Sequence, residues 1–123
     1  MIAVVDYGVG NLFSLKSSLV KIGAECIVTN DPREIKKADK ILLPGVGAFR
    51  DASDALRSSG LEGLIKKEAL SGKKIFGICL GMQMLFEESH EYGIHKGLGL
   101  IPGRVVPMAG YIPEGLKIPH IGW

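Results

Sequence analysis

The sequence has little of what several classes of protein require. It carries 2 cysteines in 123 residues, Cys26 and Cys79, which form no CxxC pair, so a disulfide scaffold or a zinc site is not expected. Its 15 basic and 13 acidic residues leave a net charge of +2 without a basic cluster. No apolar run is long enough to span a membrane, and residues 1–6 lack the features of a signal peptide. We therefore expect a cytoplasmic protein with no nucleic-acid or membrane partner.

Short apolar runs alternate with amphipathic segments along the whole chain. Four runs predict buried strands, at 2–5, 26–29, 41–43 and 75–78, and a further stretch at 104–106 is strand-like. Helices are predicted between and after them, at 12–22, from 32, over 52–70 with a break at 59–60, and at about 82–88. This alternation is typical of a single α/β domain whose parallel sheet is covered on both faces. Sites in such sheets form at the carboxyl ends of strands, here the loops 7–11, 44–49 and 77–81.

Cys79 lies between two glycines at the predicted junction of the fourth strand and the next helix. In Gly77-Ile78-Cys79-Leu80-Gly81 the glycines leave room for a sharp turn in which a Cβ would clash. A helix N-terminus beneath the sulfur favours the reactive thiolate, and the free N–H of Leu80 is placed to help hold an oxyanion. A buried cysteine is the alternative, which we prefer for Cys26 because it lies inside a plain strand. For Cys79 we favour a nucleophile.

Two further glycine loops follow strands of the predicted sheet. In Pro44-Gly45-Val46-Gly47 the glycines allow a backbone N–H to point into a site, as an oxyanion donor must. A simple tight turn is the alternative, and the neighbouring elbow favours the functional interpretation. Gly8-Val9-Gly10 resembles half of a dinucleotide fingerprint, but Phe13 occupies the place of the third glycine. We interpret it as a turn with a structural role.

A cysteine nucleophile needs a base, usually a histidine oriented by a carboxylate. His90 follows Cys79 at the far end of the predicted helix, which would put it roughly 15 Å away, too far for proton transfer. His95 falls in a loop, and His120 has no carboxylate near it in sequence. We interpret all three as surface or packing histidines, so the sequence predicts a nucleophile without its base.

Four stretches together resemble a known family: "DYGVGNL" (6–12), "LPGVGAF" (43–49), "GICLGMQ" (77–83) and "IPHIGW" (118–123). In them the chain is similar to the glutaminase subunits of imidazole glycerol phosphate synthase, which are class I, or triad, glutamine amidotransferases. "GICLG" alone is typical only of the wider superfamily, and the other three stretches, in this order, narrow the resemblance. The resemblance covers the whole chain but only the first part of the family's length.

The resemblance implies a flavodoxin-like three-layer αβα sandwich with a mostly parallel sheet, incomplete at its C-terminus. Residues 1–123 would form the N-terminal part of a single type 1 glutamine amidotransferase domain. The family's catalytic histidine and glutamate form a His-x-Glu pair further downstream, which has no counterpart here. Since the sequence stops at Trp123 within a family motif, we expect a fragment that does not turn over glutamine by itself.

The resemblance also implies the chemistry. Cys79 would attack the side-chain amide of glutamine, forming a γ-glutamyl thioester and releasing ammonia. The N–H of Leu80, with that of Val46 or Gly47, would hold the oxyanion. In this family the loop is thought to need a peptide flip, which keeps the enzyme idle without its partner.

Substrate contacts follow from the same resemblance. Gln83, one helical turn after the nucleophile, would hold the substrate amino acid, with Gly45 as a further contact. Glu91 matches a position that recognises the α-amino group, although from its surroundings in the sequence it is a surface residue. No cofactor or metal is expected.

The partner is likewise implied by resemblance. Ammonia would pass to a cyclase subunit, a (β/α)8 barrel, which forms imidazole glycerol phosphate and aminoimidazole carboxamide ribonucleotide in histidine biosynthesis. The segment 118–123, with Trp123, would lie near that subunit.

Two alternatives stay open from the sequence. Another cysteine hydrolase, such as a dienelactone-hydrolase-like enzyme, also carries Gly-x-Cys-x-Gly, although the PGVG loop and Gln83 argue against it. In a non-catalytic flavodoxin-like binding module, Cys79 would be inert towards electrophiles at neutral pH.

Overall fold

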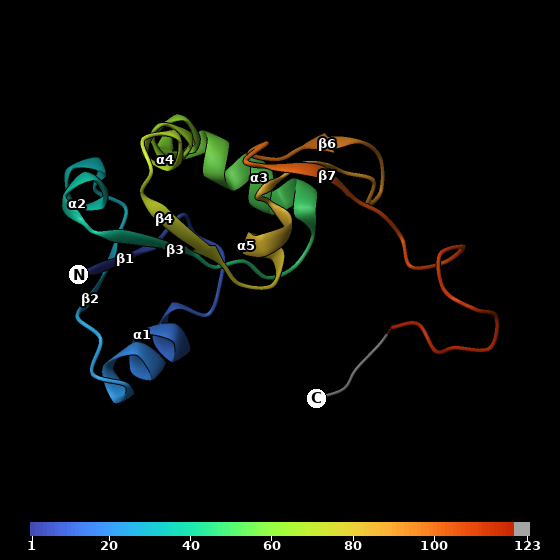
Figure 1. Cartoon of the computed structure of the whole chain (residues 1–123), viewed down its shortest axis with the longest axis horizontal. Helices are drawn as coiled ribbons and strands as arrows, with labels where there is room; N and C mark the ends of the chain where they lie inside the picture. The colour runs from blue at the N-terminus through green and yellow to red at the C-terminus, as the bar shows by residue number, and fades with distance from the viewer. Residues whose placement is uncertain (120–123) are drawn as a thin grey trace.

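The main sheet is built from four parallel strands, in the spatial order β2 (Cys26–Thr29), β1 (Ile2–Val5), β3 (Lys40–Leu43) and β4 (Lys74–Gly77) (Figure 1). The structure, a computed structural model, describes residues 1–119. Ile2 lies opposite both Cys26 and Lys40, so β1 is an inner strand paired on both edges. The rest of β1 is fully buried, as continuously apolar parallel strands are when helices cover both faces. The four predicted strands are confirmed.

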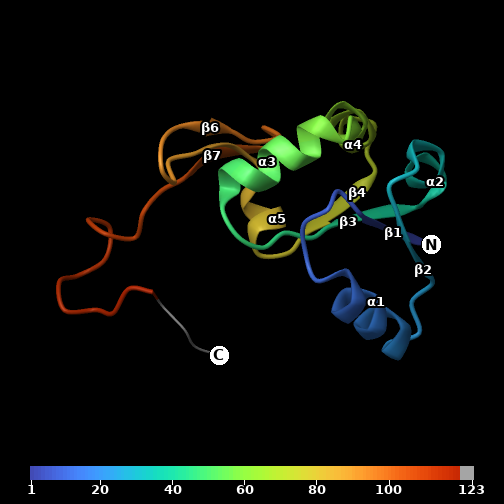
Figure 2. The same ribbon diagram turned by 180° about the vertical axis from the view of Figure 1, so that it is seen from behind.

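Helices cover both faces of this sheet, which gives the predicted three-layer arrangement. One face carries α1 (Leu12–Lys21), and the other carries α2 (Pro32–Lys37), α3 (Phe49–Ser58) and α4 (Leu61–Leu70) (Figures 1 and 2). The chain runs from β1 outward to β2, then crosses back past β1 to β3 and β4. Right-handed crossovers that run in opposite directions along a sheet lie on opposite faces. The direction changes between β1 and β3, which makes their carboxyl ends the topological switch point, where ligands bind in open α/β sheets.

Local signals set the starts of the first two helices. The side chain of Asn11 accepts a hydrogen bond from Ser14 N–H at 3.2 Å at the start of α1. Asp31 accepts from Arg33 N–H at 2.8 Å before α2, and Pro32 is the first helical residue. The Arg33 guanidinium also lowers the pKa of the Asp31 carboxyl. Over residues 1–119, no helix combines the length and the apolar character needed to cross a membrane.

A second sheet corrects one predicted element. The sequence predicts a helix at about 82–88, whereas α5 (Leu80–Gln83) ends at Gln83. The residues that follow form a three-stranded sheet in the spatial order β6 (His95–Lys96), β5 (Phe86–Ser89) and β7 (Ile101–Val105). β5 pairs antiparallel with β6 and parallel with β7, which includes most of the strand predicted at 104–106.

The helix ends early because later segments of the chain supply hydrogen-bond partners. Leu98 N–H donates to Met84 O at 2.7 Å, and Gly99 N–H donates to Phe86 O at 2.9 Å. Met84 and Leu85 are buried in the core, which accounts for the helical spacing of apolar residues in this stretch. The spacing of apolar residues indicates which side chains are buried, but it does not indicate hydrogen-bond partners far along the chain.

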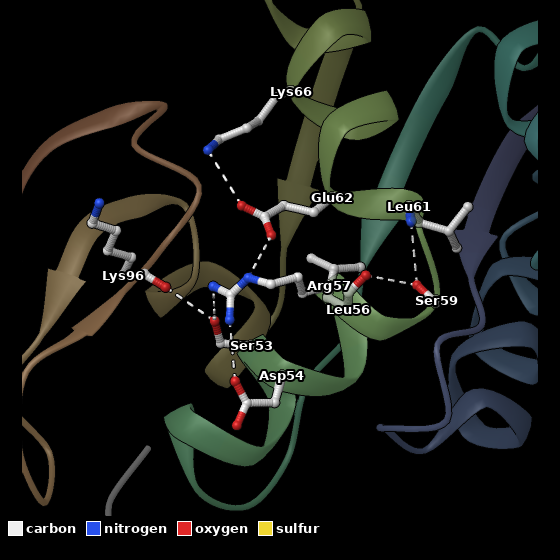
Figure 3. A network of polar contacts seen from close by, with 9 residues as sticks. All are labelled: Ser53, Asp54, Leu56, Arg57, Ser59, Leu61, Glu62, Lys66 and Lys96. Atoms are coloured by element: carbon white, nitrogen blue, oxygen red, sulfur yellow. Dashed lines mark hydrogen bonds and ion pairs between the residues drawn. The ribbon is translucent and has the colours of Figure 1, made fainter.

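A polar network attaches the second sheet to α3 (Figure 3). Ser53 Oγ donates to Lys96 O at 3.0 Å, which joins α3 to β6. Arg57 pairs with Asp54 at 3.1 Å and with Glu62 at 3.2 Å, which joins α3 to α4. Ion pairs as exposed as these contribute little to stability, so the Ser53 bond is the more important link.

The best-packed part of the core lies between the main sheet and α2–α4. Its largest fully buried side chains include Phe49, Ile35, Leu56, Leu61 and Ile65. None of the 10 residues of α1 is fully buried, and an apolar groove of about 550 Å³ runs between α1 and the sheet. Leu15, Ile75 and Phe76 are among the groove's lining residues, and Phe76 on the outer strand β4 is 66% exposed. Exposed apolar surface of this kind beside an open strand edge promotes association.

We expect a polypeptide of residues 1–123 to bind an apolar dye in this groove and to self-associate through it. Phe76→Ser should lower both the fluorescence of anilinonaphthalene sulfonate and the associated fraction in size-exclusion chromatography with light scattering. Phe13→Ser is the matched control, because Phe13 is 82% exposed but does not line the groove. Equal effects of the two substitutions would contradict this assignment.

Candidate functional site

Three segments meet at the carboxyl ends of β1, β3 and β4: the loops 7–11 and 44–48, and the turn 78–81, which leads into α5. The last two are in direct backbone contact. A Cβ on Gly45 would lie 2.5 Å from Gly81 N, and a Cβ on Gly81 would lie 2.0 Å from Leu43 O. Side-chain carbons do not approach backbone atoms so closely, so both positions require glycine. The predicted juxtaposition of the PGVG loop and the Gly-x-Cys-x-Gly turn is confirmed.

Cys79 has a backbone conformation that few residues other than glycine adopt. Its φ is 54° and its ψ is −118°, at the point where β4 turns into α5. A Cβ on Gly77 would lie 2.6 Å from Met82 N, so the glycine two positions before the cysteine is also required. The N–H groups of Met82 and Gln83 donate to Cys79 O at 3.0 and 3.2 Å, which holds the strained turn in place. This is the geometry of a nucleophile elbow.

The two cysteines differ in accessibility. Cys79 is exposed, Cys26 is half-buried in β2, and both are free thiols. A nucleophile must reach its substrate, and only Cys79 lies at the tip of a turn at the carboxyl ends of the strands. The contrast that the sequence predicts between the two thiols is therefore supported by their exposure.

Both of the contacting segments carry free backbone donors. Within residues 1–119, the N–H groups of Val46, Gly47 and Leu80 donate no hydrogen bond to another protein group. Val46 is 53% exposed, and Gly47 has a φ of 87°, a value that favours glycine. Free N–H groups on two converging segments are what an oxyanion site requires.

Side chains hold the PGVG loop at both of its ends. The Tyr7 hydroxyl donates to Pro44 O at 2.5 Å at the start, and Phe49 N–H donates to Glu91 Oε2 at 2.8 Å at the end, where α3 begins. Burial raises the pKa of Tyr7 to about 12. Tyr7 is not among the site residues predicted from the sequence. The available signal was a tyrosine close behind a buried strand, since a buried hydroxyl usually finds a partner.

Two of the three predicted substrate residues line one cavity of about 650 Å³, a volume typical of small-molecule sites. Gln83 and Glu91 contribute its amide and carboxylate, His90 contributes an imidazole, and residues 105–109 and 118–119 also line it. Among the described residues, Gly45 and Cys79 do not line this cavity, and Gly45 packs against α5 instead. The structure thus brings Gln83 and Glu91 to one cavity, which Gly45 does not line.

The histidines need one correction. The predicted separation of His90 from Cys79 rests on a helix at 82–88, and that helix is wrong because β5 leads to His90. The separation itself stays a prediction. The His90 Nε2 atom lies 2.8 Å from Glu88 Oε1, and His95 Nε2 lies 3.2 Å from Tyr92 O. His120 and Trp123 lie outside the described residues, as does most of the 118–123 segment. In residues 1–119 there is no group of three metal-ligating side chains.

Comparison with known proteins gives one consistent family. Residues 5–109 match the family model of the CobB/CobQ-like glutamine amidotransferase domain. The imidazole glycerol phosphate synthase subunit HisH of Sulfurimonas denitrificans is 52% identical over 100% of this chain and 60% of that protein. The HisH subunit of Bacillus licheniformis is 51% identical over 100% of this chain and 59% of that protein. The chain therefore spans about three-fifths of the length of these curated relatives.

A solved structure supports the fold. A crystal structure titled as a glutamine amidotransferase matches 89% of this chain and 58% of its own, with a TM-score of 0.74 and 22% sequence identity. At that identity the likeness concerns the fold, and it agrees with the α/β architecture described above.

The backbone contact at Gly81 predicts opposite effects for two glycine substitutions. Gly81→Ala should lower the free energy of unfolding by about 3 kcal/mol or more, because the new Cβ would meet Leu43 O. Gly63→Ala should raise it by roughly 0.5–1 kcal/mol, since Gly63 lies within α4 with open space around it. Urea denaturation of the two variants in the full-length protein tests this. A Gly81→Ala protein as stable as the parent would disprove the close contact.

Proposed function

The chain belongs to the glutamine amidotransferase family, and on that premise we propose that it carries the nucleophile of a glutaminase. The enzyme hydrolyses glutamine to glutamate and ammonia as a subunit of an imidazole glycerol phosphate synthase. One observation carries this proposal: Cys79 is exposed at a positive φ, and its turn packs through Gly81 against the loop that bears the free N–H groups, in a backbone contact that only glycine permits.

The reaction follows from these groups. The Cys79 thiolate attacks the side-chain amide carbon of glutamine, and the oxyanion that forms accepts hydrogen bonds from Leu80 N–H and from Val46 or Gly47 N–H. The C–N bond breaks, nitrogen leaves with a proton as ammonia, and a γ-glutamyl thioester remains. Water then attacks the thioester, which releases glutamate and returns the proton to the thiol. The histidine base that moves these protons lies beyond residue 123, in the part of the relatives' length that this chain does not span.

The cavity beside α5 supports the assignment of the substrate. Gln83 offers an amide to the amino-acid end of glutamine, and Glu91 offers a carboxylate to its α-ammonium group. Glu91 Oε2 accepts from Phe49 N–H, and within residues 1–119 no protein group donates to Oε1, which is free to meet the substrate. Gly45 acts through its packing against Gly81, which brings the loop close to the nucleophile.

The partner follows from the relatives, which are named as subunits of imidazole glycerol phosphate synthase. Ammonia passes to a cyclase subunit, a (β/α)8 barrel, which uses it to form imidazole glycerol phosphate and aminoimidazole carboxamide ribonucleotide in histidine biosynthesis. The complex works in the cytoplasm, in keeping with two free thiols, and the glutaminase reaction uses no cofactor.

Labelling and turnover in the full-length subunit, bound to its cyclase, test the proposal. A glutamine-analogue electrophile should modify Cys79 and spare Cys26, and Cys79→Ala should lower glutamate production by about 10³-fold or more. Cys26→Ser is the matched control and should keep wild-type turnover. A binding module would show an unreactive Cys79, and a hydrolase of another class would react with ester substrates but not with the glutamine analogue. Peptide mapping that finds the label on Cys26 would refute the proposal.

The polypeptide of residues 1–123 should not turn over glutamine, even when the cyclase and its nucleotide ligand are added. His90 is engaged by Glu88, and His95 by Tyr92 O, so neither ring is held for Cys79. Loss of a triad base typically lowers the rate by several orders of magnitude. The measurement is glutamate formation against a Cys79→Ala control of the same length. Turnover above that control would identify a base within this stretch, with His90 as the first to test because it lines the same cavity as Gln83.

A further inference from the structure

Tyr7 lies at the carboxyl end of β1, next to β3, where the connections that leave the two strands run in opposite directions along the sheet. It is the second residue after β1, and its hydroxyl crosses the topological switch point to reach the carbonyl of Pro44, the first residue after β3. The side chain is only 6% exposed, and its hydroxyl also lies 3.7 Å from Met84 Sδ at the end of α5. One phenol therefore contacts both the start of the PGVG loop and the segment that follows the nucleophile.

Pro44 is held from a second direction as well. A Cβ on Gly10 would lie 2.9 Å from Pro44 Cβ, so the loop after β1 packs directly against the proline ring. The ring restricts the φ of Pro44, and the bond from Tyr7 sets the direction of its carbonyl. Because a carbonyl and the following N–H share one peptide plane, this bond also orients the Pro44–Gly45 peptide.

The PGVG loop is thus anchored at both ends and open between them. Glu91 holds the far end through Phe49 N–H at 2.8 Å. Between the anchors, Val46 is exposed, and the N–H groups of Val46 and Gly47 donate to no other group within residues 1–119. Their directions follow from how the two ends are held, since no bond of their own sets them.

We propose that Tyr7 is a positioning residue for the oxyanion site. Its hydroxyl holds the Pro44–Gly45 peptide in the orientation from which the next N–H groups of the loop face the carbonyl attacked by Cys79. This inference rests on the proposed glutaminase function and adds a residue to it. The role requires a hydroxyl that stays protonated, and burial, which raises the pKa of Tyr7 to about 12, keeps it a donor at neutral pH.

Loss of this hydroxyl affects the transition state more than it affects substrate binding. Gln83 and Glu91, the proposed substrate contacts, come from other elements than Tyr7. Without its donor the Pro44 carbonyl is free to turn, and the loop N–H groups lose their common direction. Removal of an oxyanion donor typically lowers kcat by about 10²–10³-fold. Since Tyr7 acts through the loop, we expect Tyr7→Phe to lower kcat by about 10- to 100-fold and to change KM for glutamine by less than about twofold.

The test measures two reactions of Cys79 in the full-length subunit bound to its cyclase. Glutamate production passes through an oxyanion, whereas alkylation by iodoacetamide displaces iodide at a saturated carbon and forms none. Tyr7→Phe should lower kcat for glutamate as stated and leave the alkylation rate within about twofold of wild type. Tyr111→Phe is the control, because Tyr111 is exposed and lies outside the three loops, and it should match wild type in both reactions.

Circular dichroism gives the folded fraction of each variant, so kcat is referred to folded protein even if Tyr7→Phe is less stable. Equal losses in both reactions would indicate a general structural role and overturn the proposal. An unchanged kcat, or a rise in KM alone, would overturn it too. If the wild-type complex released no glutamate, the proposed function itself would fall, and that result differs from a failure confined to Tyr7.

Discussion

The approach of two backbone segments, Leu43–Gly45 and Leu80–Gly81, is the constraint on which the rest of the site depends. A Cβ on Gly81 would lie 2.0 Å from Leu43 O, and a Cβ on Gly45 would lie 2.5 Å from Gly81 N. Both obstructing atoms belong to the backbone, so neither can rotate away as a side chain would. The contact sets how closely the turn that carries Cys79 approaches the PGVG loop. It also explains why glycines occur in both motifs.

This closeness requires a strained turn, and the surroundings hold that turn in place. A positive φ at a residue such as Cys79 costs of order 1–3 kcal/mol. Two N–H groups of α5 bond to the Cys79 carbonyl, and Ile78 N–H donates to Leu43 O at 3.0 Å. The well-packed layer of α2–α4 on the main sheet supplies the stability against which this strain is tolerated. The strained residue is also exposed, a combination that is common at reactive sites.

The second sheet helps to hold the far end of the PGVG loop, at Phe49. β5 and β7 pair in parallel, and the chain that leaves β5 carries Glu91 to the N-terminus of α3, where its carboxylate accepts from Phe49 N–H. Ser53 ties β6 to α3 through Lys96 O. The small sheet is therefore part of the support for the site, and its residues link the cavity lined by Gln83 to the end of the PGVG loop.

The four parallel strands, the starts of the first helices and the turn at Cys79 can all be predicted from the sequence, because each depends on signals within a few residues. A short apolar run, a capping Asn or Asp, and glycines two positions either side of a cysteine act locally. Three features depend instead on contacts between distant segments: β5 in place of the helix predicted at 82–88, the bond from Tyr7 to Pro44, and the bond from Phe49 to Glu91. Tyr7 and Pro44 are 37 positions apart in the chain, and Phe49 and Glu91 are 42 positions apart. A hydrogen bond between distant segments depends on which chain ends the fold brings together, and no local pattern carries that information.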